Sequence, residues 1–359
     1  MPVIYLAGGT KAVFEFANHL VSRGHKVSVI YPLVPMGGGN VWRNIRKLGG
    51  AVLRTISNLA NGNQLDWFDL KANLVRVPSL DERFIPDADV IVATWWETAY
   101  YVSRYSDRKG RKFYLAQHYE VWGGPKDKVD NSFRLGLKII VNSTWLENIL
   151  KNEVNVKTEA MILHAPDRDV FYPVDGLQKD RNVVRVLMPY RKEDWKGAMD
   201  GIKAFEIARD KYPDIRLVMF GPEKNGKIPR YAEFHLRPSD SQLRELYNGC
   251  DIFLLPSWCE GFGMPPLEAM ACRCAVVTTN VGAVPDYAIP GETALVSEPR
   301  DIEGLARNII RMVADERERE NIAKKGCDYT KELTWSGAAG SLEEVFARSF
   351  CSSHTAGRI

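Results

Sequence analysis

Two glutamates, Glu260 and Glu268, bracket a glycine-rich turn in the sequence SWCEGFGMPPLEAMA, which spans residues 257–271. Carboxylates accept two hydrogen bonds at once, and this geometry suits the neighbouring hydroxyls of a sugar or a ribose. Gly261 and Gly263 lie between the glutamates, and glycine lets a ligand approach the backbone closely. These residues predict a site for a hydroxyl-rich ligand. The structural alternative is that Glu268 complements a helix dipole and Glu260 is a solvated loop charge.

The turn joins a predicted strand to a predicted helix. The apolar run DIFLLP at 251–256 is typical of a buried strand in a parallel sheet. Pro265 and Pro266 suit the first turn of a helix, which we expect to continue through residues 267–272. The start of a helix offers unpaired N–H groups and a positive dipole end. This junction is therefore predicted to hold an anion.

Two cations, Arg191 and Lys196, lie in the loop PYRKEDWKG at 189–197, directly after another predicted strand. A planar guanidinium and a compact ammonium together suit a diphosphate. Two basic residues in a loop mean little alone, but parallel strands end at one edge of a sheet, so we expect this loop to face the glycine turn. The sequence shows no Asp-rich metal site. We therefore expect the two cations to neutralise a diphosphate without a metal ion, and we expect no cofactor.

Length and composition set broad limits on the class of protein. A chain of 359 residues with 45% hydrophobic and 26% charged residues is most simply a soluble protein of two domains. No apolar run approaches the roughly 20 residues that span a bilayer, and the start MPVIYLAGG reads as a strand and not as a signal peptide. The six cysteines, none before Cys250, do not form a disulfide or zinc pattern. We expect a cytoplasmic location and no nucleic-acid partner.

Hydrophobic patterning predicts two doubly wound α/β domains. A strand at 3–7, the pair Gly8-Gly9, a helix at 11–23 and a strand at 27–31 open the first domain. We predict an N-terminal domain at 1–165, a linker at 166–182, a C-terminal domain at 183–334, and a final helix and tail at 335–359 that return to the first domain. Further strands are expected at 75–77, 90–93, 113–117, 139–142, 183–188, 215–220, 233–236 and 275–278, and further helices at 198–211, 239–248, 302–313 and 335–350.

Charge is uneven along the chain. Residues 1–165 contain 21 basic and 15 acidic residues, whereas the remainder contains 27 and 30. The segment 41–54 mixes Trp42 with Arg43, Arg46 and Lys47, a pattern that can touch a membrane surface. An ordinary amphipathic surface helix is the alternative. We predict peripheral contact with the inner membrane face through this half of the protein.

Aromatic residues follow the predicted strand ends of the first half. Six of the nine tryptophans lie in this half. The loops carry Trp95, Trp96, Tyr119 and Trp122, which suit stacking on sugar rings, although buried core aromatics are the alternative. Thr144 and Glu147 have the spacing of a helix capping box.

These motifs resemble the retaining nucleotide-sugar glycosyltransferases of family four. The resemblance lies in EGFGMPPLEAM, in Arg191 and Lys196-Gly197, in Phe220-Gly221-Pro222, in the opening GGT and in VGAVPDYAIPGETALV, and it runs from Val3 to about Phe350. It implies two Rossmann-like domains that face each other across a cleft. Within that cleft, Glu268 would hold the ribose, Glu260 with Gly261, Phe262 and Gly263 the donor sugar, and Arg191 and Lys196 the diphosphate. Gly9 would approach the phosphates, and His118 would contact the donor sugar.

The resemblance implies a retaining, metal-independent glycosyltransferase of the hexosyltransferase type, acting in glycolipid or polysaccharide synthesis. It would move a sugar from a nucleoside-diphosphate sugar to a hydroxyl acceptor. Three departures are visible, namely Trp258-Cys259 before Glu260, His164-Ala165 where the family usually has Asn-Gly, and Tyr119-Glu120 after His118 where the family has an Asp. The alternatives are a nucleotide-sugar epimerase of similar fold and a non-catalytic nucleotide-sugar-binding protein.

Overall fold

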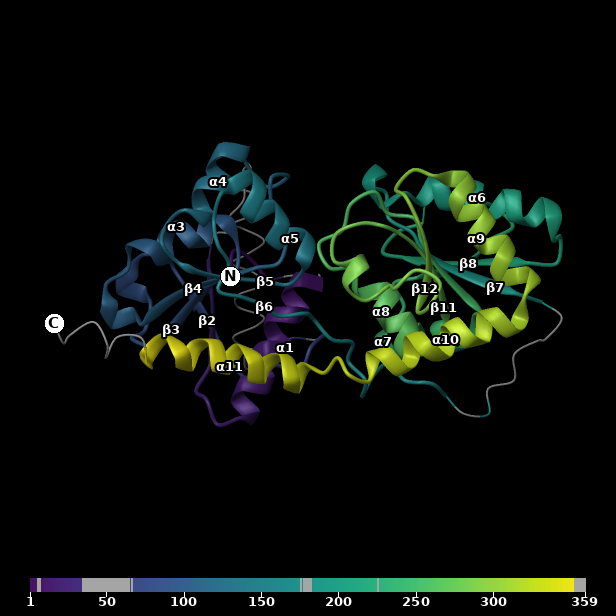
Figure 1. Ribbon diagram of the computed structural model, residues 1–359. Helices are drawn as coiled ribbons and strands as arrows, with labels where there is room; N and C mark the ends of the chain where they lie inside the picture. The colour runs from purple at the N-terminus through teal and green to yellow at the C-terminus, as the bar shows by residue number, and fades with distance from the viewer. Residues whose placement is uncertain are drawn as a thin grey trace. The chain divides into compact units, whose positions relative to one another are not determined.

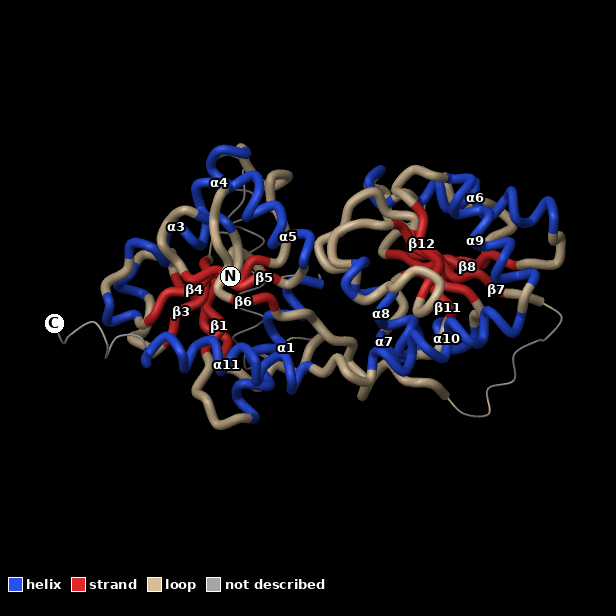
Figure 2. The backbone as a smooth tube through the Cα atoms, viewed as in Figure 1, coloured by secondary structure: helices blue, strands red, loops and turns tan. Residues whose placement is uncertain are grey.

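The computed structural model describes residues 1–4, 8–33, 65, 67–174, 176, 183–224 and 226–351. The chain forms two compact units, Met1–His164 with Trp335–Ile359, and Ala165–Thr334. Each unit has parallel strands with helices packed against them (Figures 1 and 2). The predicted α/β fold with two Rossmann-like domains is thereby confirmed. The basic segment 41–54, and residues 5–7 of the first predicted strand, lie outside the described residues.

The first unit contains a four-stranded parallel sheet in the order β3-β4-β5-β6 and a parallel pair β1-β2. Its core includes the fully buried Tyr114, Phe133 and Leu146. The strands are β1 (Ser28–Pro32), β2 (Asn73–Val77), β3 (Val90–Ala93), β4 (Arg111–Ala116), β5 (Lys138–Val141) and β6 (Ala160–Met161). The helices are α1 (Gly8–Ser22), α3 (Trp96–Arg104), α4 (Lys126–Phe133), α5 (Thr144–Ile149) and α11 (Trp335–Cys351).

Helix α11 belongs to the first unit although it ends the described chain. It packs along α1 (Figure 1). Glu343 of α11 accepts hydrogen bonds from Arg23 Nε at 2.6 Å and pairs with His25 Nε2 at 2.7 Å. Phe346 packs against Phe113 of β4, with ring centroids 4.7 Å apart. The predicted return of the final helix to the first domain is confirmed.

The second unit is built on a six-stranded parallel sheet in the order β12-β11-β10-β7-β8-β9. Its strands are β7 (Arg185–Pro189), β8 (Arg216–Gly221), β9 (Glu233–Leu236), β10 (Ile252–Leu255), β11 (Ala275–Thr279) and β12 (Ala294–Ser297). Every residue of β10 and β11 is buried, as expected for short apolar runs in the middle of a parallel sheet. Because β7 and β10 pair directly, the loops that follow them start side by side.

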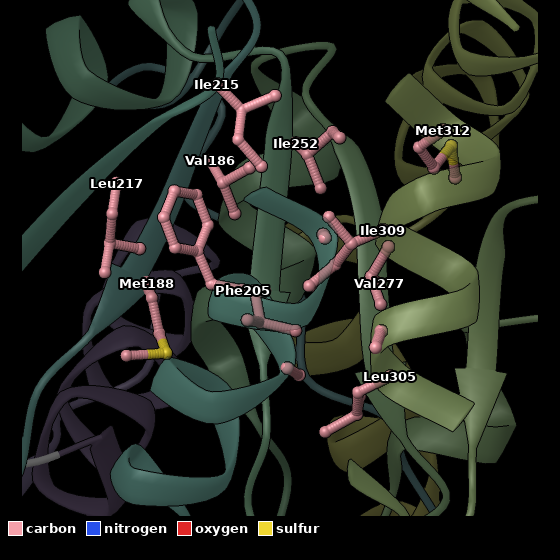
Figure 3. Close-up of a cluster of buried hydrophobic side chains, with 14 of the residues drawn as sticks. Val186, Met188, Phe205, Ile215, Leu217, Ile252, Val277, Leu305, Ile309 and Met312 are labelled. Carbon is pink, nitrogen blue, oxygen red and sulfur yellow. The ribbon is translucent and has the colours of Figure 1, made fainter. Parts of the chain in front are cut away.

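Helices cover both faces of this sheet (Figure 2). They are α6 (Ala198–Lys211), α7 (Asp240–Gly249), α8 (Met264–Ala271), α9 (Ile302–Ala314) and α10 (Glu316–Thr330). Helices α6 and α9 pack together on one face, where Phe205, Leu305 and Ile309 meet Val186 and Val277 of the sheet (Figure 3). Helices α8 and α10 pack together and against β11.

Residues 166–174, in the segment predicted as a linker, pack within the second unit. Phe171 is 3% exposed and lies edge-on to Tyr247, with ring centroids 5.8 Å apart. The Asn248 side chain donates to the Tyr172 carbonyl at 3.0 Å and accepts from the Val174 N–H at 2.7 Å.

Two local predictions are wrong. The helix predicted at 11–23 begins at Gly8, so the pair Gly8-Gly9 lies in its first turn and does not precede it. Ser143, and not Thr144, caps α5, because the Ser143 hydroxyl accepts the Leu146 N–H at 3.2 Å. Glu147 does not complete a capping box; its carboxylate instead accepts the Thr158 hydroxyl at 2.6 Å. A Ser-Thr pair offers two candidate caps, and only the extended backbone of Ser143, with φ −161° and ψ 151°, identifies the correct one.

Candidate active site

The loop after β7 is held against the loop after β10. Gly197 has a left-handed φ of 63°, and a Cβ atom there would lie 1.9 Å from the Pro256 carbonyl oxygen. Glycine is therefore required for this approach. The Trp258 N–H donates to the Trp195 carbonyl at 2.7 Å and ties the two loops by a backbone hydrogen bond. The sheet thus brings Lys196 beside Glu260, which is 64 residues later in the sequence.

Lys196 and Glu260 form a two-pronged ion pair. The Lys196 Nζ lies 2.9 Å from both carboxylate oxygens of Glu260. The side chains are 31% and 12% exposed, respectively. The Ser257 hydroxyl adds a third hydrogen bond, 2.7 Å to Glu260 Oε1. The cation predicted for a diphosphate and the carboxylate predicted for a sugar therefore lie together in one fixed group.

The glycine turn after Glu260 is held by a later segment of the chain. Gly263 is the N-cap of α8 and has a φ of 80°. The Tyr287 hydroxyl donates to the Gly263 carbonyl at 2.6 Å, and the Ala283 N–H donates to the Gly261 carbonyl at 3.0 Å. At Gly282, a Cβ atom would lie 2.2 Å from the Glu260 carbonyl oxygen. These contacts fix the direction of the α8 N-terminus.

Phe262 of this turn packs against the ring of Tyr287. Phe262 is 6% exposed, and its ring centroid lies 5.6 Å from that of Tyr287. Burial, and next the nearby Glu260 carboxylate, raises the pKa of Tyr287 well above its ordinary value. The Tyr287 hydroxyl therefore keeps its proton and acts as a donor. Sequence reasoning assigned Tyr287 no role; the only signal was its place in VGAVPDY, just after β11.

Glu268 lies in the second turn of α8, where it was predicted. The Tyr247 hydroxyl donates to Glu268 Oε2 at 3.0 Å. Tyr247 is completely buried, and burial, followed by the charge of Glu268, raises its pKa well above the ordinary value. This protonated hydroxyl orients the carboxylate. Tyr247 was also missed, because its place in α7 gave no sign of a partner on α8.

Arg191 lies on the same loop as Lys196. It is exposed, and within the described ranges it makes no hydrogen bond or ion pair. The loop begins at Tyr190, whose N–H donates to the Phe220 carbonyl at 2.7 Å and so fixes the start of the loop against the end of β8. Arg191 is therefore an exposed cation next to an anchored backbone, five residues before Lys196 in the sequence.

The first unit brings Gly9 and the His118 loop together. Gln117, directly after β4, donates its side-chain N–H to the Gly9 carbonyl at 3.1 Å. His118 Nδ1 lies 2.9 Å from the Tyr119 carbonyl oxygen. Because a carbonyl only accepts, Nδ1 carries a proton. The His118 ring is edge-on to Trp145, at 5.4 Å between centroids.

The four aromatic residues predicted for the acceptor side separate into two groups. Trp96 and Tyr119 are each 7% exposed and belong to the core, so they offer no open stacking surface. Trp122 is 65% exposed, and Trp95 is half-buried beside it, with ring centroids 5.2 Å apart. The prediction that all four form a stacking surface is corrected to this pair, because α3 starts at Trp96 and turns its ring inward.

Glu120 is a buried carboxyl that sequence reasoning did not single out. It is 4% exposed and accepts the Trp96 N–H at 2.8 Å and the Tyr114 hydroxyl at 3.3 Å. Burial raises the pKa of Glu120 well above its ordinary value. It connects the Trp95-Trp96 loop to the Tyr119–Trp122 loop.

Outside the candidate site, the described residues include a hollow in the second unit but no cluster arranged to hold a metal ion and no helix that could span a membrane. An open hollow of about 630 Å³ lies between α6 and the start of α9, is lined by Lys203, Glu206 and Arg300 among others, and contains none of the predicted site residues. Across the ranges that the structure describes, no group of three or more His, Cys, Asp or Glu residues is arranged to hold a metal ion. None of the helices in those ranges combines the length and the apolar character that a membrane span requires.

Comparison with known proteins identifies the family of the second unit. Residues 174–328 match the family model described as glycosyl transferases group 1. Since this stretch covers nearly the whole of Ala165–Thr334, the second unit is a group 1 glycosyl transferase domain. The family resemblance seen in the motifs is confirmed there.

Individual relatives match parts of the chain. O-antigen chain mannosyltransferase B of Escherichia coli is 35% identical over 96 residues, which are 27% of this chain and 25% of that protein. A D-inositol 3-phosphate glycosyltransferase of Corynebacterium aurimucosum is 27% identical over 236 residues, which are 58% and 56% of the two chains. This chain thus spans about a quarter of the length of one relative and just over half of the other.

Solved structures extend the likeness to both units. The crystal structure of Anabaena HepE in complex with UDP and glucose has a TM-score of 0.69 and covers 95% of this chain and 96% of its own, at 14% identity. At that identity the likeness concerns the fold, which is the two-domain fold of glycosyltransferases.

Proposed function

We propose that this protein is a glycosyltransferase of the hexosyltransferase type. It moves a sugar from a nucleoside-diphosphate sugar to a hydroxyl acceptor, with retention of configuration and without a metal ion. The acceptor belongs to glycolipid or polysaccharide synthesis. The observation that carries the proposal is the Lys196–Glu260 pair, which holds a cation and a carboxylate 2.9 Å apart, one residue before the glycine turn that starts α8.

Such a pair matches the reacting bond of a nucleotide sugar, where a negative phosphate is joined directly to a hydroxyl-bearing ring. Lys196 has three N–H donors and can keep a bond to Glu260 while it binds a phosphate oxygen. Glu260 accepts sugar hydroxyls, and its hydrogen bond from Ser257 keeps it oriented when Lys196 turns to the ligand. Gly261, Phe262 and Gly263 are proposed to hold the same sugar through their backbone.

The remaining donor contacts are proposed on the same chemical grounds. Arg191, together with the N–H groups at the start of α8, stabilises the charge that develops on the leaving diphosphate. Glu268, oriented by Tyr247, binds the two ribose hydroxyls. In the first unit, Gly9 is assigned to the phosphates, His118 to the donor sugar, and the Trp95–Trp122 pair to the acceptor.

Relatives support this class of donor and acceptor. The matched proteins include a mannosyltransferase of O-antigen chains and an inositol-phosphate glycosyltransferase, and HepE was crystallised with UDP and glucose. Metal independence is proposed because Arg191 and Lys196 supply two positive charges where the diphosphate leaves. Retention is proposed from the family resemblance.

A donor screen tests the proposal. The protein is incubated with UDP-, GDP- and dTDP-linked hexoses, with and without short glycan or glycolipid acceptors, and free nucleoside diphosphate is measured. Release that rises with an acceptor, persists in EDTA and is lost in Lys196→Ala is the expected result. An epimerase would convert the donor sugar without an acceptor, and a sensor would bind a nucleotide sugar without release. Proton NMR of the first product reports the anomeric configuration.

A further inference from the structure

Trp258 lies at the centre of the contacts that join the two loops of the candidate site. It stands between β10 and Glu260, two residues before the glutamate. Its backbone N–H donates to the Trp195 carbonyl at 2.7 Å. Its indole Nε1 donates to Asp200 Oδ2, also at 2.7 Å, in the first turn of α6. Trp258 thus connects the Glu260 loop to the Lys196 loop through its backbone, and to the helix that follows that loop through its side chain.

Arg300 packs on the face of the Trp258 ring. The guanidinium carbon lies 4.2 Å from the centre of the indole ring, which places a cation on the ring face. Arg300 has a φ of 68°, a left-handed conformation that is uncommon for arginine. It directly precedes Asp301, the N-cap of α9. The ring is therefore held at its edge by Asp200 and on its face by Arg300.

These contacts govern the spacing of the reacting groups. Lys196 and Glu260 belong to different loops, so their separation depends on how the loops are joined. The joining contacts are the Gly197–Pro256 approach and the bonds made by Trp258. Removing the indole N–H frees the Glu260 loop from α6 without altering the chemistry of the Lys196 or Glu260 side chain, so only their relative position can change.

We infer that Trp258, held by Asp200 and Arg300, is a positioning residue that sets the Lys196–Glu260 geometry for the diphosphate of the donor. The inference rests on the proposed function, since it concerns the same diphosphate. Trp258 itself makes no contact with the ligand in this proposal and acts through Lys196 and Glu260. It also gives a role to Trp258, one of the two residues before Glu260 that depart from the family pattern.

Calorimetric binding of UDP, GDP and dTDP to the whole protein provides the test. Trp258→Phe keeps an aromatic ring under Arg300 but removes the hydrogen bond to Asp200. We expect it to weaken binding of the preferred nucleotide by about 3- to 10-fold, the range that one lost hydrogen bond gives. Trp67→Phe, which alters a half-buried indole stacked on Phe14 in the first unit, is the matched control and should bind as the wild type does.

Asp200 supplies a second pair of variants. Asp200→Asn and Asp200→Leu remove the same charge, but asparagine still accepts the indole N–H through its side-chain oxygen. Binding should be near wild type in Asp200→Asn and weakened in Asp200→Leu. This comparison stands even if Trp258→Phe fails to fold.

A double variant separates positioning from a general loss of structure. Because Trp258 acts through Lys196, Trp258→Phe should cause no further weakening in the Lys196→Ala background. Wild-type affinity in both Trp258→Phe and Asp200→Leu would overturn the inference while the proposed function stands. The inference would also be overturned if the double variant lost nucleotide affinity by the product of the two single-variant factors. If the wild type binds none of the three nucleotides, the proposed function fails, and this inference fails with it.

Discussion

The hydroxyl of Tyr287 donates a 2.6 Å hydrogen bond to the carbonyl of Gly263, the N-cap residue of α8. The donor is completely buried, and the acceptor has a left-handed backbone. A side chain beyond β11 therefore fixes the turn that carries the candidate donor site.

Tyr287→Phe should loosen this turn. The change removes one side-chain hydrogen bond to a buried carbonyl, a loss of about 0.5–1.5 kcal/mol in the free energy of unfolding. We also expect weaker nucleoside diphosphate binding, because the α8 N-terminus loses its fixed direction. Tyr329→Phe removes a comparable bond to the Asp286 carbonyl, 2.9 Å long, without touching the turn. Urea unfolding and calorimetry on both variants decide the matter: equal nucleotide affinity in the two would show that the Tyr287 bond is only structural.

Lys196→Ala and Arg191→Ala should fold normally and lose activity. Each removes a charge-assisted contact of roughly 1.5–3 kcal/mol, which corresponds to about a 10- to 100-fold loss in kcat/KM. The charge on the diphosphate grows toward the transition state, so kcat should fall more than donor binding weakens. Lys192→Ala, on the same loop with an exposed ion pair to Glu223 at 3.6 Å, is the control. Normal turnover in both variants would remove the diphosphate role.

The buried His164 should make the stability of the first unit sensitive to acid. It is 2% exposed beside Phe16 and Trp335, and burial lowers its pKa to about 3. The ordinary value is near 6.5, so below that pH the unfolded chain binds a proton that the folded chain does not. Stability should therefore fall as pH drops from about 6.5 toward 3, by up to about 1.4 kcal/mol per pH unit.

Urea unfolding at about pH 7, 5.5 and 4.5 measures this effect. His164→Leu should flatten the dependence, whereas His19→Gln, at a partly exposed position on α1, should keep it. An unchanged pH slope in His164→Leu would mean that other groups cause the acid sensitivity.

Trp95→Ala and Trp122→Ala should raise the KM for the acceptor and leave the KM for the donor unchanged. The exposed ring of Trp122 and the half-buried ring of Trp95 offer one aromatic surface, and we propose that a sugar ring of the acceptor stacks there. Tyr101→Ala, which removes another exposed aromatic side chain from α3, serves as the control. If acceptor KM and turnover stay unchanged in both tryptophan variants, the acceptor lies elsewhere.

Peripheral membrane contact is predicted from the basic first half of the sequence and from the segment 41–54. Cosedimentation with anionic phosphatidylglycerol vesicles should be strong at low salt and weak at high salt, because screening removes the attraction. Neutral phosphatidylcholine vesicles provide the control. Equal recovery with both kinds of vesicle at low salt would contradict the prediction.

Local patterns in the sequence predicted most of the elements that carry the site. Short apolar runs located β10 and β11, and the proline pair after the glycine turn located α8. Helix α10 was not predicted, because its sequence ERERENIAKKGCDYT is mostly charged and buries only a few residues, Ile322 and Cys327 among them. The four-residue strand β12 was too short to show any alternation.

Local sequence patterns could not predict the contacts between segments that are distant in the chain. Lys196 and Glu260 were each predicted from residue type and place. Their direct ion pair depends on β7 lying next to β10, and the sequence of neither segment predicts this strand order. Trp95 and Trp96 are chemically alike and adjacent, so only the start of α3 decides which ring is buried. Tyr247 and Tyr287 were missed because each acts on a group in a different element.

The return of α11 to α1 makes the first unit discontinuous along the chain. During synthesis, the second unit has all of its residues once Thr334 has emerged, whereas the first unit still lacks the helix that pairs Glu343 with Arg23 and His25. The later unit can thus complete its fold before the earlier one, which reverses the usual N-terminal-first order. A chain that stops at residue 334 would leave the unit holding Gly9 and His118 without one of its helices.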